Sequence, residues 1–180
     1  MRLVIFFLFC FYSLSASASV PSAYVKFAKQ YQVNPQVLYA VARAESTWPR
    51  HPLPPRPAWP WTANIGGKSY YFSTREALYR KLHNYLQTGR LNFDVGIMQI
   101  NWQANSHYFK GDLWSATDPY TNIAAGARHL SQLLSKHKSY IRAIGLYHTG
   151  STNTAARKAR AERYTRRVFT YLVKSGGKHS

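Results

Sequence analysis

The only cysteine of this 180-residue chain, Cys10, lies in an N-terminal segment with the pattern of a secretory signal peptide. Arg2 supplies a positive charge, residues 3–14 form an apolar run, and Ala16-Ser17-Ala18 fits a cleavage site, so residues 1–18 are expected to be removed. Serines cut this run short of the roughly 20 apolar residues that a membrane-spanning helix needs. Residues 19–180 would then contain no cysteine, and such a domain must be stabilised by its apolar core without disulfides.

The charge balance of the chain is strongly basic. There are 24 Lys and Arg against 6 Asp and Glu, which gives a formal net charge of +18 at pH 7. The 46% of hydrophobic residues is enough for a core, and this excludes a disordered polycation. Basic exported proteins meet anionic surfaces, so cell-wall polymers or lipid headgroups are the expected contacts, and no recognised nucleic-acid motif accompanies the charge. One basic cluster stands out near the C-terminus: Arg157, Lys158, Arg160, Arg163, Arg166 and Arg167.

The spacing of apolar residues predicts a mainly helical domain. A first amphipathic helix is expected over residues 22–32, and a second begins at Asn34-Pro35, where Asn34 can cap and Pro35 suits the first turn. A third is expected from a capping box formed by Ser73 and Glu76, and it would end at Gly89. Three further helices are expected over residues 118–136, 140–148 and 155–174, the last of them basic.

The segments between these helices have other signals. Residues 49–60 contain six prolines and are flanked by tryptophans, which indicates a rigid extended loop. Gly66-Gly67, within residues 62–72, predicts a short β-hairpin. The turn Asp94-Val95-Gly96 leads into the apolar residues 97–102, for which a strand is the expectation. The fold class is therefore mainly α, with a small β-hairpin and a Pro/Trp-rich loop inserted before this stretch.

Only six carboxylates are available for chemistry, and four have local structural explanations. Glu76 and Asp118 are expected to cap helices, and Asp112 to lie in a turn. Glu162 falls among arginines on an exposed helix. Any reaction that needs a carboxylate must therefore draw on Glu45 or Asp94.

Glu45 continues the apolar stripe of its helix, so its carboxyl is expected on the core-facing side near the helix end. A partly apolar environment keeps a carboxyl protonated near neutral pH, as the general acid of glycoside cleavage requires. The structural alternative for Glu45 is an ion pair with a nearby arginine such as Arg43. For Asp94 the structural alternative is a turn aspartate that caps the following segment.

Four motifs occur together in a fixed order. They are Glu45-Ser46 at the end of a helix, Gly96-Ile97-Met98-Gln99-Ile100-Asn101, Asn122-Ile123 to Gly126 opening a helix, and Tyr147 to Gly150 closing another. Over residues 22–150 this set resembles the lytic transglycosylases of the goose-lysozyme-like superfamily. It is most similar to the small secreted type that accompanies conjugative transfer, type IV secretion or type IV pilus assembly. The resemblance implies one lysozyme-like domain over residues 19–180, located in the periplasm of a Gram-negative bacterium.

The resemblance also implies a reaction on the glycan strands of peptidoglycan. Glu45 would be the single catalytic acid and base, acting between N-acetylmuramic acid and N-acetylglucosamine. It would protonate the glycosidic oxygen, the substrate's acetamido group would stabilise the cationic centre, and Glu45 would take the proton of the muramyl C6 hydroxyl. The product is a 1,6-anhydro sugar. This route needs no second carboxylate, unlike the usual glycosidase pair.

The remaining site residues are carried over from the resemblance one by one. Ser46 would hydrogen-bond near Glu45 or the sugar, Gln99 would bind polar groups of the sugar, and Met98 would line the cleft. Tyr147 would orient Glu45 through its hydroxyl, and Asn101 would brace the cleft. His148 stands where the family usually has asparagine, which affects the geometry beside Tyr147. No cofactor and no metal site is expected, because the histidines lack ligand spacing.

Three other readings of the chain stay open. A true lysozyme would use Asp94 to activate water and release a reducing sugar. A noncatalytic wall-binding or assembly factor would use the basic helix and the Trp-rich loop without chemistry. An exported DNA-binding protein would lose affinity steeply with added salt.

Overall fold

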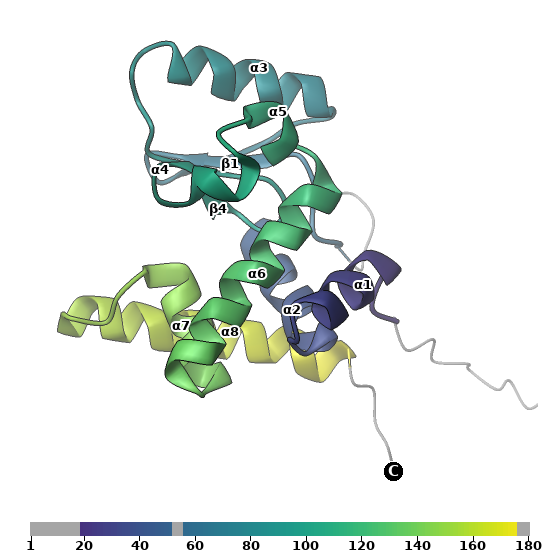
Figure 1. Ribbon diagram of the computed structural model, residues 1–180, viewed down its shortest axis with the longest axis vertical. Coiled ribbons are helices and arrows are strands. Elements are labelled where there is room, and N and C mark those ends of the chain that lie inside the picture. Colours follow the sequence, from purple (N-terminus) through teal and green to yellow (C-terminus); the bar gives the residue numbers. More distant parts are fainter. Residues whose placement is uncertain (1–18, 52–55, 176–180) are drawn as a thin grey trace, which may run out of the picture.

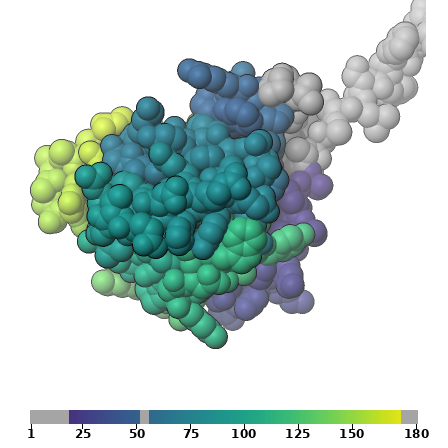
Figure 2. Space-filling model, turned by 90° about the horizontal axis from the view of Figure 1, so that it is seen from above, coloured from purple at the N-terminus to yellow at the C-terminus, as the bar shows by residue number. Residues whose placement is uncertain are grey.

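The computed structural model describes residues 19–51 and 56–175, and the expected signal peptide with Cys10 lies outside them. In the described part the chain is mainly α with one small antiparallel sheet, as the sequence predicts. The sheet, α3, α4 and α5 lie at one end, α1, α2, α7 and α8 lie at the other, and α6 runs between the two ends (Figure 1). Viewed from above, the surface of the first end consists mainly of the teal part of the chain, and the yellow α8 emerges at one side (Figure 2).

The long helices begin and end where capping residues direct them. Asn34 accepts a hydrogen bond from the Val37 backbone N–H at 3.0 Å, and Pro35 takes the first helical position of α2. Gly150 ends α7 in the left-handed conformation at φ 65°. The helices in chain order are α1 (Ser22–Gln30), α2 (Pro35–Ser46), α3 (Arg75–Leu86), α4 (Trp102–Asn105), η1 (Ser106–Phe109), α5 (Leu113–Ala116), α6 (Pro119–His137), α7 (Tyr140–Thr149) and α8 (Ala155–Ser175).

The expected cap of α3 is displaced by one residue. The Thr74 hydroxyl, not that of Ser73, accepts from the Ala77 backbone N–H at 3.2 Å. Glu76 still lies in the first turn, where hydrogen bonds from its own backbone and from Thr74 lower its pKa. The helix ends at Leu86, before the turn that contains Gly89.

The hairpin forms at the expected glycines and is extended into a sheet. Gly66 and Gly67 both have positive φ, at 59° and 84°, which suits a two-residue turn between adjacent antiparallel strands. The strands are β1 (Thr62–Ile65), β2 (Lys68–Tyr71), β3 (Phe93–Val95) and β4 (Ile100–Asn101), in the spatial order β2-β1-β3-β4. All three pairings are antiparallel.

Residues 97–102 do not form the expected strand. Ile97–Gln99 form a turn, only Ile100 and Asn101 pair with β3, and α4 begins at Trp102. The chain reverses because Gly96 has φ 79° and Gln99 has φ 46°. This turn is held by Asn122 of α6, whose fully buried amide accepts from the Met98 N–H and donates to the carbonyls of Val95 and Ala116.

Glycine is required at two places around this turn. A Cβ on Gly96 would lie 2.5 Å from the Asn122 side chain, and a Cβ on Gly126 would lie 2.6 Å from the Met98 side chain. Both distances are far below van der Waals contact. The Gly96 backbone in the turn therefore packs directly against Asn122 of α6, and the Gly126 backbone in α6 packs directly against Met98 of the turn.

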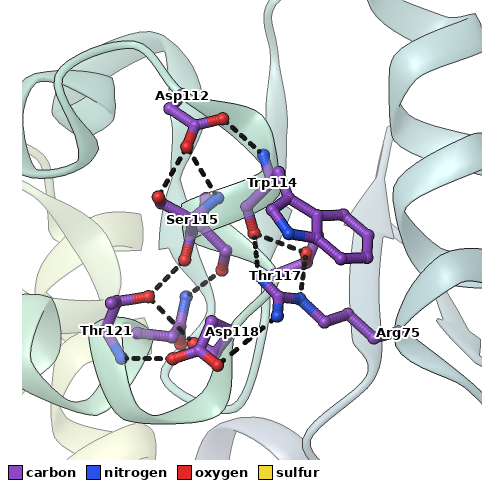
Figure 3. Close-up of polar contacts among 9 residues, drawn as sticks. Arg75, Asp112, Trp114, Ser115, Thr117, Asp118 and Thr121 are labelled. Atoms are coloured by element: carbon purple, nitrogen blue, oxygen red, sulfur yellow. Dashed lines mark hydrogen bonds and ion pairs between the residues drawn. The ribbon is translucent and has the colours of Figure 1, made fainter.

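A polar network fixes the N-terminus of α6 to α3 and α5 (Figure 3). Asp118 caps α6 by accepting from the Thr121 N–H at 2.9 Å, and its other oxygen lies 3.6 Å from Arg75 Nη1. Arg75 of α3 also donates to the Trp114 carbonyl at 2.7 Å and to the Thr117 hydroxyl at 3.2 Å. The position of α6, and of Asn122 on it, is thus tied to both neighbouring helices.

We expect Asn122→Ala to lower the free energy of unfolding by about 3 kcal/mol, because it leaves two buried carbonyls and one buried N–H unpaired. Urea unfolding followed by circular dichroism measures this change. The matched control is Asn153→Ala at an exposed site, which should cost less than about 0.5 kcal/mol. Equal stability of the two variants would contradict the role assigned to Asn122.

Candidate active site

A cleft of about 930 Å³ lies between the two ends of the molecule and contains both unexplained carboxylates. Its walls come from α2, the sheet, α4, α6, α7 and α8. The polar and charged side chains that line it include Arg43, Glu45, Arg56, Asn64, Ser69, Tyr71, Asp94, Gln99, Asn101, Asn105, His129, Tyr147, His148, Thr149, Arg167 and Tyr171.

Glu45 lies in the last turn of α2 with its side chain 11% exposed. Its ion-pair contact within the described residues is with His148 and not with Arg43: His148 Nδ1 is 3.7 Å from the carboxylate Oε1. The His148 ring stacks on Tyr164 of α8, with centroids 4.3 Å apart and planes 3° from parallel. Stacking therefore holds His148 beside Glu45.

Tyr164 of α8 is buried next to these two residues, at 3% exposure. Burial raises its pKa well above the usual range, and the negative charge of Glu45 raises it further. Its hydroxyl has no partner of good hydrogen-bond geometry among the described residues, so the contact with Glu45 is a weak one. Tyr164 stays neutral and gives Glu45 a largely apolar neighbour.

Asp94 faces the same cleft from the sheet and does not cap a turn. On β3 it alternates with Phe93 and Val95, which are buried at 1% and 0% exposure, so its side chain lies on the opposite face. Burial raises the pKa of Asp94, a hydrogen bond from Asn101 lowers it, and the charge of Glu45 raises it again. The interpretation of Asp94 as a turn cap is wrong, and two carboxylates interact across the cleft.

Gln99 and Asn101 form the wall around Asp94. The Gln99 side-chain amide donates to the Gly96 carbonyl at 2.8 Å and to the Thr62 carbonyl at 3.3 Å. The Asn101 side-chain nitrogen donates to Asp94 at 2.9 Å, and its side-chain oxygen accepts from the Ala104 N–H. One side chain therefore both positions Asp94 and caps α4. Both side chains line the cleft, with their amides fixed by the turn.

Tyr147 and His129 are partly buried neutral groups that line the cleft. The Tyr147 hydroxyl donates to the Met98 carbonyl at 2.9 Å, so its proton goes to the turn and not, as expected, to Glu45. Burial, and then the charge of Glu45, raise the Tyr147 pKa far above its usual range. The His129 ring packs 5.1 Å from Tyr147, and burial lowers the pKa of His129 to about 4, which keeps it uncharged at neutral pH.

Two expected site residues are removed from the cleft by burial. Ser46 is 0% exposed, and its hydroxyl donates to the Ala42 carbonyl one helical turn back, at 2.8 Å. Met98 is also 0% exposed and packs against Gly126. Neither side chain lines the cleft, so the expected contacts of Ser46 and Met98 with the sugar are not supported; both residues position their neighbours Glu45 and Gln99.

Several cleft residues were not singled out from the sequence. The sequence presents His129 only as one of the histidines without ligand spacing, and Arg167 only as a member of the basic C-terminal cluster. Arg43 was considered only as a partner for Glu45. The alternation Phe93-Asp94-Val95 is the one signal that could have placed Asp94 in the cleft, since it puts the carboxylate opposite two core residues.

The described residues contain no group of three His, Cys, Asp or Glu side chains that could hold a metal ion. No helix among them has both the length and the apolar character needed to cross a bilayer.

Comparison with known families agrees with this geometry. The model of the transglycosylase SLT domain matches residues 22–169, which is more than half of the chain. The chain therefore belongs to the transglycosylase SLT domain family, and the mainly α, lysozyme-like fold is confirmed. This domain is typical of lytic transglycosylases, which act as lyases on peptidoglycan. No curated protein and no solved structure matched the chain.

We expect Asp94→Asn to raise the free energy of unfolding at pH 7. Burial raises the pKa of Asp94 in the folded state. The contribution of Asp94 to folding stability is therefore most favourable below the unfolded pKa of about 3.9, and it is lost as pH rises through the folded pKa. The ionised carboxylate thus lowers stability at pH 7, whereas asparagine carries no charge and its side-chain oxygen can still accept the hydrogen bond from Asn101. Urea unfolding at several pH values should show the gain at pH 7 disappear below pH 4.

The matched control is Asp112→Asn, which makes the same change in net charge. Hydrogen bonds from Ser115 and the backbone of α5 lower the pKa of Asp112, so its replacement should lower stability at pH 7. A gain of the same sign in both variants would contradict the account of Asp94.

Proposed function

We propose that the protein cleaves the β-1,4 bond between N-acetylmuramic acid and N-acetylglucosamine in peptidoglycan, with formation of a 1,6-anhydro product. The observation that carries the proposal is the position of Glu45, whose carboxyl is 11% exposed and opens on a cleft lined by fixed polar groups. Family membership supports peptidoglycan as the substrate. The cleft offers amide and hydroxyl side chains from the sheet and from the helices.

The proposed reaction uses Glu45 twice. As an acid, its carboxyl gives a proton to the glycosidic oxygen while the C1–oxygen bond breaks, and the substrate's acetamido oxygen stabilises C1. As a base, the carboxylate then takes the proton of the muramyl C6 hydroxyl while the C6 oxygen bonds to C1. The proton balance closes with Glu45 protonated again, and no water is consumed.

The surrounding groups suit these two roles. Tyr147 and His129 are neutral at physiological pH, so they line the cleft without adding charge. His148 Nδ1 lies 3.7 Å from the Glu45 carboxylate and places a polar ring beside it. Gln99, held by its two carbonyl partners, presents a fixed amide to the sugar.

A hydrolytic muramidase is the second candidate, and the position of Asp94 favours it. Asp94 faces the cleft, and its pKa is raised in part by the charge of Glu45, so the pair resembles the two carboxylates of glycosidases. In that reaction Asp94 would activate a water molecule. The two routes differ in their products, since hydrolysis adds one water and the intramolecular route adds none.

The setting of the enzyme is also part of the proposal. An expected signal peptide at residues 1–18 and a formal charge of +18 fit an exported, periplasmic enzyme that opens the wall locally for a conjugative, secretion or pilus apparatus. The basic cluster on α8 is exposed and would hold the enzyme on the anionic wall or on a membrane surface: Arg157, Lys158, Arg160, Arg163, Arg166 and Arg167.

We expect Glu45→Gln to reduce peptidoglycan cleavage by at least about 100-fold, because it removes the only proposed acid and base. Release of soluble muropeptides from purified sacculi measures the rate, and a pelleting assay should show that the variant still binds sacculi. The matched control is Glu162→Gln, an exposed position on α8, which should stay within about twofold of the parent rate. Full activity of Glu45→Gln would exclude the proposal, and retained binding distinguishes loss of chemistry from loss of folding.

Binding of the Glu45→Gln variant to sacculi should weaken as sodium chloride rises from 50 to 500 mM, because screening reduces attraction between the basic helix and the wall. A parallel gel-retardation assay with duplex DNA tests the nucleic-acid alternative. Wall binding that does not change with salt would contradict the electrostatic role. DNA binding that is tighter than wall binding would favour the alternative.

A further inference from the structure

Three arginines from separate parts of the chain line the cleft that contains Glu45. Arg43 comes from α2, Arg56 from the segment before β1, and Arg167 from α8. None of them forms an ion pair within residues 19–51 and 56–175. These three guanidinium groups therefore line the cleft without a direct ion-pair partner among the described residues.

None of the six side-chain carboxylates forms an ion pair with these arginines, although Glu45 and Asp94 line the same cleft. Glu76, Asp112 and Asp118 lie at helix N-termini, and Glu162 is exposed. Asp94 accepts from Asn101, and Glu45 pairs with His148. A direct ion-pair partner for the arginines must come from a bound molecule or from solvent ions.

Aromatic rings hold two of the arginines in place. The Arg43 guanidinium lies 4.5 Å from the Tyr171 ring centre, and the Arg167 guanidinium lies 5.1 Å from that of Tyr164. The Arg167 charge also lowers the pKa of Tyr71, which burial and Tyr171 raise, so these cleft residues lie near one another. Stacking of a guanidinium restricts its motion and leaves its N–H groups available, which favours planar recognition of a carboxylate.

Arg43 has a further feature that points to a ligand. Its Nε atom is buried and has no hydrogen-bond partner among the described residues. A buried donor without a partner costs free energy, and a bound acceptor near the guanidinium would offset that cost.

Arg43 and Arg167 lie close to Glu45, the proposed catalytic residue. Arg43 precedes Glu45 by two residues on α2, and Arg167 follows Tyr164, the neighbour of Glu45, by three residues on α8. A strand placed with its scissile bond at Glu45 would bring the substituents of the muramic acid close to this wall.

We propose that Arg43 and Arg167, with Arg56, form a subsite for the carboxylates of the peptide that muramic acid carries on its lactyl group. This inference rests on the proposed function. Within a peptide-bearing strand the sugars are uncharged, so the carboxylates of the peptide are the anions available to these guanidinium groups. The lactyl group offers the same chemistry once the peptide is removed, and the experiment separates these two sources.

The test compares two substrates: glycan strands with their peptides intact, and strands from which an amidase has removed them, which leaves only the lactyl carboxylate. Arg167→Gln should lower the ratio of kcat/KM on peptide-bearing to peptide-free strands by about tenfold, the effect of losing one charge-assisted hydrogen bond. Arg167→Lys keeps the charge and should recover part of the ratio. Arg167 is exposed, so its replacement avoids the packing that half-buried Arg43 provides.

The matched control is Arg166→Gln, the adjacent exposed arginine, which does not line the cleft and should keep the parent ratio. A ratio in Arg167→Gln equal to that control would overturn the subsite. A loss on peptide-free strands alone would assign the arginines to the lactyl carboxylate, which is free only after the amidase has acted. An equal loss on both substrates would assign them to a sugar group that both strands share. Either result would overturn the peptide assignment.

Failure of the proposed function is detected separately, because a parent enzyme that cleaves neither substrate refutes the cleavage reaction itself.

A binding measurement then tests the role of the arginines without catalysis. In the Glu45→Gln background, calorimetric affinity for a disaccharide tetrapeptide should fall about tenfold on adding Arg167→Gln and should not fall on adding Arg166→Gln. Equal affinities in the two double variants would overturn the inference.

Discussion

The hydrogen bonds of the buried Asn122 amide determine the geometry of the cleft. This one side chain on α6 accepts from the Met98 N–H and donates to the carbonyls of Val95 and Ala116. It thereby fixes the turn after β3, which in turn carries Asp94 on one side and Gln99 on the other. Because Gly96 and Gly126 let the backbone and side chains approach closely, the turn cannot shift without breaking these contacts. The separation between the sheet and Glu45 on α2 follows from this arrangement.

The charges in the cleft are arranged around Glu45 in a way that a single acid and base can use. Two tyrosines, Tyr147 and Tyr164, stay neutral because burial and the carboxylate both raise their pKa. His148 is the polar partner of Glu45, and Asp94 is a second carboxylate whose protonation is favoured by burial. The positive charge of the chain, which first indicated only an anionic surface, also enters the cleft as Arg43, Arg56 and Arg167.

Local signals in the sequence were sufficient for most of the fold. Asn34, Asp118 and Gly150 mark helix ends through contacts within a few residues, and Gly66-Gly67 specifies a hairpin for the same reason. Elements that depend on distant contacts were predicted less well. Residues 97–102 form a short apolar segment that contains two amides and resembles a strand, but Asn122, far along the chain, holds residues 97–99 in a turn. Ser46 and Met98 show the same limit, because their burial depends on packing that no local pattern reveals.

In the proposed reaction Glu45 alone carries both proton transfers, and no water enters the product. Mass spectrometry of the muropeptides that residues 19–180 release from purified sacculi tests this most directly. The expected products end in 1,6-anhydro-N-acetylmuramic acid. Products heavier by one water, with a reducing end, would contradict the proposed reaction and would assign the second carboxylate, Asp94, to catalysis.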